Sequence, residues 1–103
     1  MSIKIANYEF EGPYQSVDNI KNQPGLYAVI LQTTKNLFLL DLGESENVKS
    51  KIKSHERKKL WDKYATQGDL VYSTCYVKDD DKNEREQMIN EINKVYKTPF
   101  NKE

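Results

Sequence analysis

The stretch GLYAVILQTTKNLFLLDLG, residues 25–43, holds the two strongest strand patterns in the chain. Residues 26–32 and 37–42 are apolar runs of strand length, and the polar residues 33–36 between them are few enough to form a turn. Two apolar runs joined in this way predict a hairpin whose faces are both largely covered by other elements. A glycine bounds the hairpin at each end, as expected where a regular strand is interrupted.

Shorter elements are predicted on the N-terminal side of this hairpin. Residues 3–10 alternate loosely between apolar and polar side chains, which is typical of an edge strand. We expect Gly12-Pro13 to end that strand, because both residues interrupt regular structure. Residues 16–20 predict a single helical turn.

Two helical segments are predicted after Gly43. Ser45 or Asn47 is a candidate cap for the first of them. The inward face of this helix carries, at helical spacing, Val48, Ile52 and His55. The second segment ends at Gly68 and carries Leu60, Trp61 and Tyr64.

The C-terminal part of the chain predicts one strand and one helix. Residues 70–77 are rich in β-branched and aromatic side chains, which favours a third strand. The acidic residues 79–81 lead into a helix that Pro99 closes. The apolar stripe of this helix is formed by Met88, Ile89, Ile92, Val95 and Tyr96.

The order of these elements predicts the fold class. At 103 residues the chain has the length of one domain and is too short for two. We expect residues 1–103 to form a single α/β domain, a small sandwich with a short mixed three-stranded sheet flanked by helices. An N-terminal extension strand is expected to lie beside that sheet.

The charges of the chain cancel overall but are segregated along it. Sixteen basic and sixteen acidic residues give a net charge of zero. Residues 47–63 contain seven basic side chains against two acidic ones, a balance of +5, whereas residues 79–91 have six acids against two bases. The basic segment predicts either a phosphate-facing surface or a solvated helix face. In the first case its DNA contacts would include Lys49, Lys53 and Arg57.

The apolar runs are too short for a membrane span. Residues 26–31 and 37–40 fall well below the roughly 20 residues that a transmembrane helix requires. We find no signal-peptide pattern and expect a soluble, cytoplasmic protein with no membrane contact. The single cysteine, Cys75, has no partner for an internal disulfide and is expected to be a core residue.

Several short motifs resemble the GIY-YIG nuclease family. Gly25-Leu26-Tyr27 begins one predicted strand, and Gly43 ends the next and is followed by a helix. Lys51 and His55 lie eight and twelve positions beyond Gly43, where the family presents a basic residue and a Tyr or His. Thr98-Pro99-Phe100-Asn101 is similar to the family's ending. The match covers about residues 24–101.

The resemblance implies a site that cleaves a phosphodiester with one divalent metal, a tyrosine and an arginine. The matched positions of the site are Tyr27, Asp41, Lys51, His55 and Asn101. Tyr27 either positions a water or phosphate or is an ordinary strand tyrosine. Asp41 stands in place of a tyrosine and either acts as a base or metal ligand or pairs with Lys51. His55 is either functional or packed.

Two replacements weaken this implied chemistry. Lys51 stands where the family has arginine, so it keeps the charge but lacks the planar fork that binds two phosphate oxygens. Ile89 occupies the position of the metal-binding glutamate, and an isoleucine cannot bind Mg²⁺. Glu86, one turn earlier, is a candidate for a displaced ligand.

These residues lead to one hypothesis and two alternatives. We expect a catalytically impaired GIY-YIG domain, without a cofactor, that binds DNA weakly or acts as an interaction module. One alternative is an active Mg²⁺- or Mn²⁺-dependent endonuclease with a rearranged carboxylate site drawn from Asp41, Glu44 and Glu86. The other is a domain that binds only a protein partner. The sequence does not determine the oligomeric state.

Overall fold

The central hairpin of the molecule consists of β3 (Gly25–Gln32) and β4 (Leu37–Ser45). A computed structural model describes residues 2–78 and 81–98 of the chain. In it, Tyr27 lies opposite Gly43 and Val29 opposite Asp41. The hairpin predicted from residues 25–43 is therefore confirmed.

The sheet around this hairpin is larger than predicted. Five strands form it in the order β1-β2-β5-β3-β4, and every neighbouring pair is antiparallel. Besides the two strands of the hairpin, the sheet contains β1 (Ser2–Ile5), β2 (Tyr8–Tyr14) and β5 (Asp69–Tyr76). The prediction of a mixed three-stranded sheet was therefore wrong, although the α/β class and the third strand near residues 70–77 were right.

The N-terminal extension is a hairpin and not one strand. Ala6, in the left-handed region at a φ of 56°, turns the chain between β1 and β2. The predicted end at Gly12-Pro13 was also wrong, because β2 continues to Tyr14 through an irregularity in its pairing with β5. Gly12 has a φ of 103°, a conformation that glycine adopts without the strain of a Cβ, so the strand bends here without ending.

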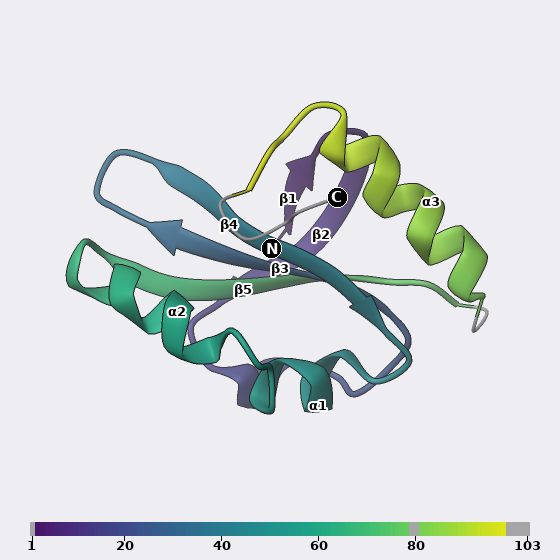
Figure 1. Cartoon of the computed structure of the whole chain (residues 1–103), viewed down its shortest axis with the longest axis horizontal. Coiled ribbons are helices and arrows are strands. Elements are labelled where there is room, and N and C mark those ends of the chain that lie inside the picture. The colour runs from purple at the N-terminus through teal and green to yellow at the C-terminus, as the bar shows by residue number, and fades with distance from the viewer. Residues whose placement is uncertain (1, 79–80, 99–103) are drawn as a thin grey trace.

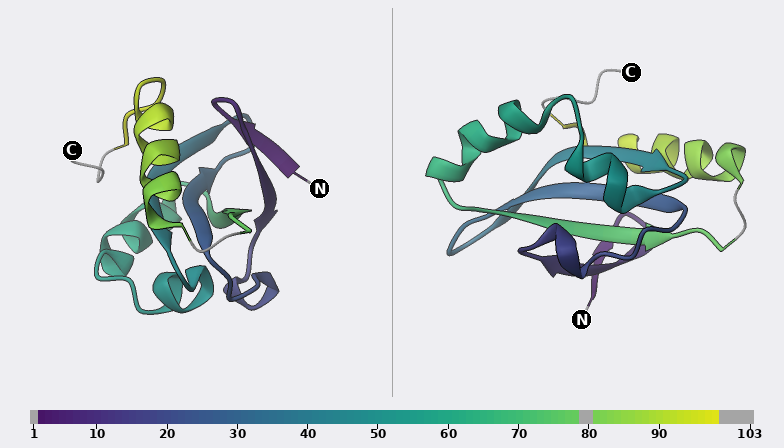
Figure 2. Two further views of the ribbon diagram at one scale, coloured as in Figure 1. Left: turned by 90° about the vertical axis from the view of Figure 1, so that its right-hand side faces the viewer. Right: turned by 90° about the horizontal axis from the view of Figure 1, so that it is seen from below.

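Helices cover both faces of the sheet (Figures 1 and 2). One face carries α1 (Val48–Lys53), α2 (Lys58–Asp62) and the short 3₁₀ helices η1 (Val17–Asn19) and η2 (Lys63–Thr66). The other face carries α3 (Lys82–Asn93). Among the helices of the described residues, none is long and apolar enough to cross a membrane.

The alternation of side chains along β3 divides the core into two layers. Leu26, Ala28 and Ile30 pack with Met88 and Ile92 of α3. The intervening residues pack on the other face with α1 and α2, in a cluster that includes Tyr27, Val29, Leu31, Val48, Ile52 and Trp61. Such complete burial of both faces explains why residues 26–31 form a continuous apolar run, whereas Gln32 at the end of the strand is exposed.

The last helix ends earlier than its apolar pattern predicted. Met88 and Ile92 are buried, and Ile89 packs against the same cluster. Val95 and Tyr96 are exposed because α3 ends at Asn93. Cys75 is half-buried against the α3 side of the core and is a free cysteine.

Candidate functional site

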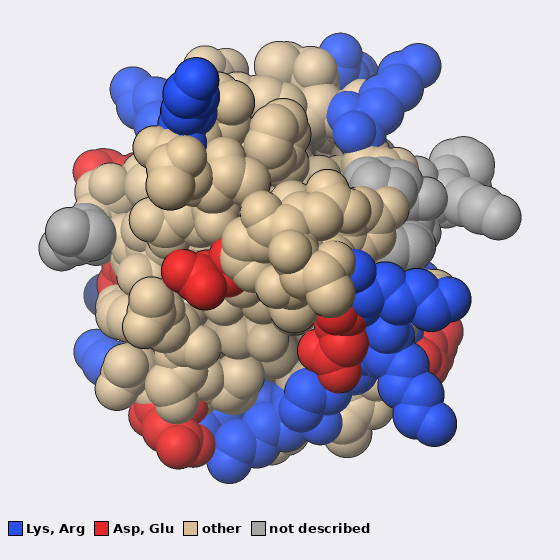
Figure 3. Space-filling view, turned by 90° about the vertical axis from the view of Figure 1, so that its left-hand side faces the viewer, with Lys and Arg blue, Asp and Glu red and all other residues tan. Residues whose placement is uncertain are grey.

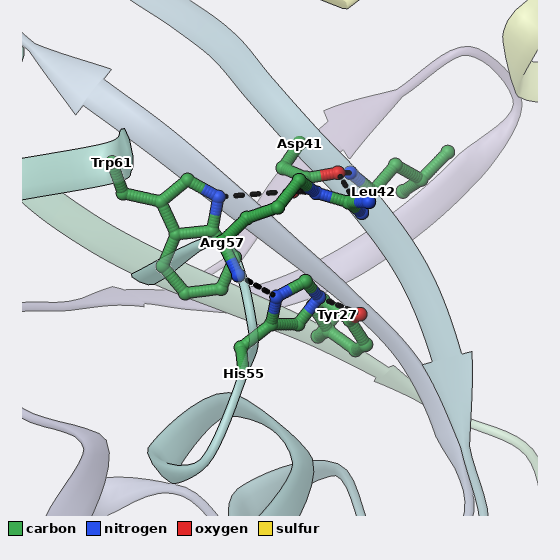
Figure 4. Close-up of polar contacts among 6 residues, drawn as sticks. All are labelled: Tyr27, Asp41, Leu42, His55, Arg57 and Trp61. Carbon is green, nitrogen blue, oxygen red and sulfur yellow. Dashed lines mark hydrogen bonds and ion pairs between the residues drawn. The ribbon is translucent and has the colours of Figure 1, made fainter. Parts of the chain in front are cut away.

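Five side chains meet between the β3–β4 hairpin and residues 55–61, which run from the end of α1 into α2. We call this group, formed by Tyr27, Asp41, His55, Arg57 and Trp61, the polar cluster (Figure 4). Two of its members come from the hairpin, and the other three from residues 55–61. The cluster therefore joins the sheet to the layer of short helices.

A bulge in β4 aims Asp41 into this cluster. The register with β3 shifts between Val29, opposite Asp41, and Ile30, opposite Leu39, which leaves Leu40 as the extra residue. Leu40 and Asp41 consequently both face α1 and α2, where regular alternation would have separated them.

The Asp41 carboxylate is fully buried and receives four hydrogen bonds. Oδ2 accepts from Nε of Arg57 at 2.8 Å and from Nε1 of Trp61 at 2.9 Å. Oδ1 accepts from Nη2 of Arg57 at 3.1 Å and from the backbone N–H of Leu42 at 2.9 Å. Each oxygen thus has two donors, which matches the usual accepting capacity of a carboxylate oxygen and supports a buried charge.

Arg57 combines this fixed geometry with access to solvent. Its guanidinium binds both oxygens of Asp41, and its side chain remains 30% exposed while that of Asp41 is 0% exposed. The hydrogen bonds to Asp41 raise the pKa of Arg57 above its ordinary value, so the group carries a permanent charge. Arg57 is therefore a pre-oriented cation at the border of the cluster.

His55 has one defined neutral tautomer. The backbone N–H of Arg57 donates to Nδ1 at 3.0 Å, which requires an unprotonated Nδ1. The hydrogen of the neutral ring then lies on Nε2, which donates to the Tyr27 hydroxyl at 2.8 Å. Burial lowers the pKa of His55, and the charge of Arg57 lowers it further. The ring is therefore neutral at pH 7 and has no free nitrogen to act as a base.

Tyr27 is packed against the backbone of the neighbouring strand. A Cβ placed on Gly43 would overlap the hydroxyl and ring of Tyr27, so glycine is needed there. Burial raises the pKa of Tyr27, with a further increase from Asp41, and the hydroxyl stays protonated at neutral pH. Its ring also meets His55 edge-on, with centroids 5.7 Å apart, and His55 lies against Trp61 at 4.5 Å. The close packing of Tyr27, from the first motif, on Gly43, from the second, therefore explains why these two residues lie opposite each other.

The structure brings together some of the predicted site residues. Tyr27, Asp41 and His55 lie in the cluster, and Lys51 is close enough for its charge to lower the pKa of His55. The alternative pairing of Asp41 with Lys51 is not formed, because Arg57 occupies both carboxylate oxygens. Asn101 lies outside the described residues.

The three predicted DNA contacts have partners within the chain. Lys49 approaches the backbone carbonyl of Asp18 at 3.5 Å, and Lys53 forms an exposed ion pair with the carboxylate of Asp18 at 3.5 Å. Arg57 is held by Asp41. The exposed ion pair is weak enough to exchange for a ligand, since such pairs contribute little in water.

The candidate metal ligands do not converge. Glu44 lies on the α3 face of β4 and accepts from Nε of Arg85 at 2.7 Å, whereas Asp41 lies on the opposite face. Glu86 is exposed on α3, on the far side of the sheet from the cluster. No group of three His, Cys, Asp or Glu side chains suited to a metal ion occurs within residues 2–78 and 81–98.

Two parts of the cluster were not predicted. Trp61 was expected only as an apolar residue of a helix, and its indole N–H turns out to bind Asp41. Arg57 was expected to face DNA and is also the ion-pair partner of Asp41. A buried acid usually requires a cation beside it, and this rule could have predicted a basic partner for Asp41. It could not identify Arg57 as that partner, because residues 47–63 contain seven basic side chains.

Comparisons of the chain with protein-family models, with curated proteins and with solved structures found no match.

Proposed function

We propose that this chain is a catalytically impaired relative of the GIY-YIG nucleases that binds nucleic acid by its phosphates, with Arg57 as the central contact. One observation carries the proposal: the guanidinium of Arg57 is clamped by a buried carboxylate while its side chain stays 30% exposed. An arginine fixed in this way binds a phosphate with less loss of side-chain freedom than a mobile lysine.

The charges around Arg57 support the same proposal. Residues 47–63 carry a balance of +5, and Lys51, Lys59 and Lys63 are exposed within them. Figure 3 shows Lys and Arg side chains gathered along the lower edge of one face, the level at which α1 and α2 lie in Figure 1, with some acidic side chains among them. A basic surface of this kind attracts the phosphate backbone without reading its sequence.

The geometry of the cluster favours binding over cleavage. Tyr27 and His55 are buried, and His55 already uses both ring nitrogens. Asp41 uses both carboxylate oxygens. A general base needs a free lone pair within reach of a substrate, and His55 and Asp41 have none to give without rearrangement. The Tyr27 hydroxyl is buried and stays protonated at neutral pH, so it does not act as a base either.

The test is DNA binding by a variant in which the pair is neutral. Asp41→Asn combined with Arg57→Gln keeps hydrogen-bonding groups in the cluster and leaves the net charge of the chain unchanged. We expect its Kd for a fluorescein-labelled single strand or duplex of about 20 nucleotides, measured by anisotropy at low salt, to rise about tenfold. The slope of log K against the logarithm of the salt concentration should decrease by about one, as expected for the loss of one phosphate contact.

The matched control is Lys35→Ala in the β3–β4 turn, which removes an exposed cation away from the cluster. It should leave the Kd unchanged. DNA binding by the neutral-pair variant equal to that of the wild type would overturn the proposal. Salt-independent or absent DNA binding by the wild type would favour the alternative of a protein-binding domain.

Two single variants, Asp41→Asn and Glu86→Gln, test the endonuclease alternative. Cleavage of plasmid DNA by the wild type in Mg²⁺ or Mn²⁺, lost in Asp41→Asn or Glu86→Gln, would support an active enzyme with a rearranged carboxylate site. We expect the wild type to cleave the plasmid no faster than either variant does.

A further inference from the structure

An open apolar groove lies at the end of the molecule where β3 turns into β4. Its volume is about 650 Å³, and its walls come from β1, the end of β3, the first half of β4, the region of η2 and the segment that follows α3. Figure 3 looks onto this end, where a broad area of uncharged side chains is interrupted and bordered by Lys and Arg and by a few Asp and Glu side chains. The polar cluster contributes no residue to the groove.

Large apolar side chains are exposed along this groove. Leu37 and Phe38 are each 48% exposed, and Tyr96 is 42% exposed. Only two other large hydrophobic side chains of the described residues, Leu60 and Val95, are exposed to a similar extent, and neither lines the groove. Exposed apolar side chains gathered in one hollow mark a binding surface more often than scattered ones do.

The backbone beside the groove also has capacity to bind. Within residues 2–78 and 81–98, β4 pairs with β3 alone, so its outer edge has no strand beside it. The regular part of this edge that lines the groove, Leu37-Phe38-Leu39, runs up to the bulge at Leu40 and contains no charged residue and no proline. Natural edge strands are usually protected by such residues, and an unprotected edge is a template for another strand.

The charges at the groove indicate what kind of strand it accepts. Among the described residues that line it, Lys4 and Lys97 are charged and none is acidic. A second copy of the chain that docked through the same surface would bring lysines against lysines, which disfavours self-pairing. An incoming segment with acidic residues would be attracted instead.

We propose that the groove binds an extended peptide segment of a partner protein, apolar at alternate residues and acidic at its ends, which adds as a strand to β4. Backbone hydrogen bonds along β4 would supply affinity, and insertion of alternate apolar side chains beside Phe38 would supply specificity. This proposal does not depend on Arg57 or on nucleic-acid binding.

The test is selection of displayed random heptapeptides on the full chain, followed by anisotropy with the dominant peptide made synthetically. We expect enriched peptides to alternate apolar residues and to carry Asp or Glu near an end. Phe38→Ser should weaken binding at least tenfold, and Lys4→Glu combined with Lys97→Glu should weaken it several-fold. Hydrogen exchange of the backbone amides at residues 37–40 should slow when the peptide binds.

Leu60→Ser is the matched control, because Leu60 is also an exposed leucine but lies outside the groove. It should bind the peptide as the wild type does. Selected peptides that bind Phe38→Ser as tightly as wild type, or that bind without slowing exchange at residues 37–40, would overturn the proposal. Concentration-dependent dimerisation of the chain that Phe38→Ser abolishes would also overturn it, in favour of a second copy as the occupant.

Discussion

Two acids of β4, three residues apart, each pair with an arginine. In one pair the acid is the buried member, and in the other the arginine is. On the α1–α2 face the acid Asp41 is 0% exposed and its partner Arg57 is 30% exposed. On the α3 face the base Arg85 is 1% exposed and its partner Glu44 is 19% exposed. The same strand therefore presents a cation to solvent on one side of the sheet and an anion on the other.

This difference shows that an ion pair has two separate roles in the molecule. The buried member holds the layers together, because its charge is stable in the core only while its partner is present. The exposed member is the one that a ligand can reach. The comparison thus explains why we place anion binding at Arg57 and not at Arg85, which is the more deeply buried arginine.

The largest effect should come from removing the exposed member of the first pair. Arg57→Met leaves the Asp41 carboxylate buried without its cation, and we expect the free energy of unfolding to fall by about 3–5 kcal/mol. Urea denaturation followed by circular dichroism measures this. The double variant Asp41→Asn, Arg57→Gln should recover most of the loss, and failure to recover would mean that the packing of Arg57 matters more than its charge.

A smaller effect should follow from disturbing the cluster without touching either pair. Gly43→Ala places a methyl group against Tyr27, and overpacking of this kind lowers stability by about 1–3 kcal/mol. The same urea titration measures it, with Tyr27→Leu added as a second change to make room. If Gly43→Ala is as stable as the wild type, the close packing of β3 and β4 at this point is not as tight as described.

Removing the arginine of the second pair should have a smaller effect than Arg57→Met. Arg85→Met leaves Glu44, whose side chain reaches solvent, so no fully buried charge loses its partner. We expect the free energy of unfolding to fall by about 1–2 kcal/mol. A loss equal to that of Arg57→Met would break the comparison, since it would show that burial of the remaining acid does not decide the effect.

The smallest effect should be on the pH dependence of stability near neutrality, since the chain has a single histidine. Burial and Arg57 lower the pKa of His55, so below about pH 6.5 the unfolded chain binds a proton that the folded chain resists. Stability should therefore be fully present above pH 6.5 and decrease as the pH falls toward the folded-state pKa. Urea titrations between pH 5 and 8 measure this, and His55→Asn should reduce the slope.

The local elements were largely predictable from residue patterns. The two apolar runs of residues 25–43 indicated the β3–β4 hairpin, and the spacing of Val48 and Ile52 indicated the buried face of α1. The number of strands was not predictable from residues 3–10, because an alternating run contains no sign of the turn that Ala6 makes within it. The pairing of β1, β2 and β5 is between distant segments, so local patterns do not contain it.

The sequence by itself determined the β3–β4 hairpin, the third strand near residues 70–77 and which side chains are apolar enough to be buried. Only the tertiary structure decided which of the basic residues near α1 and α2 pairs with Asp41, since that depends on the bulge at Leu40 and on the position of Trp61. The physical reason is range: strand and helix patterns come from neighbours along the chain, whereas a buried ion pair depends on groups that folding brings together.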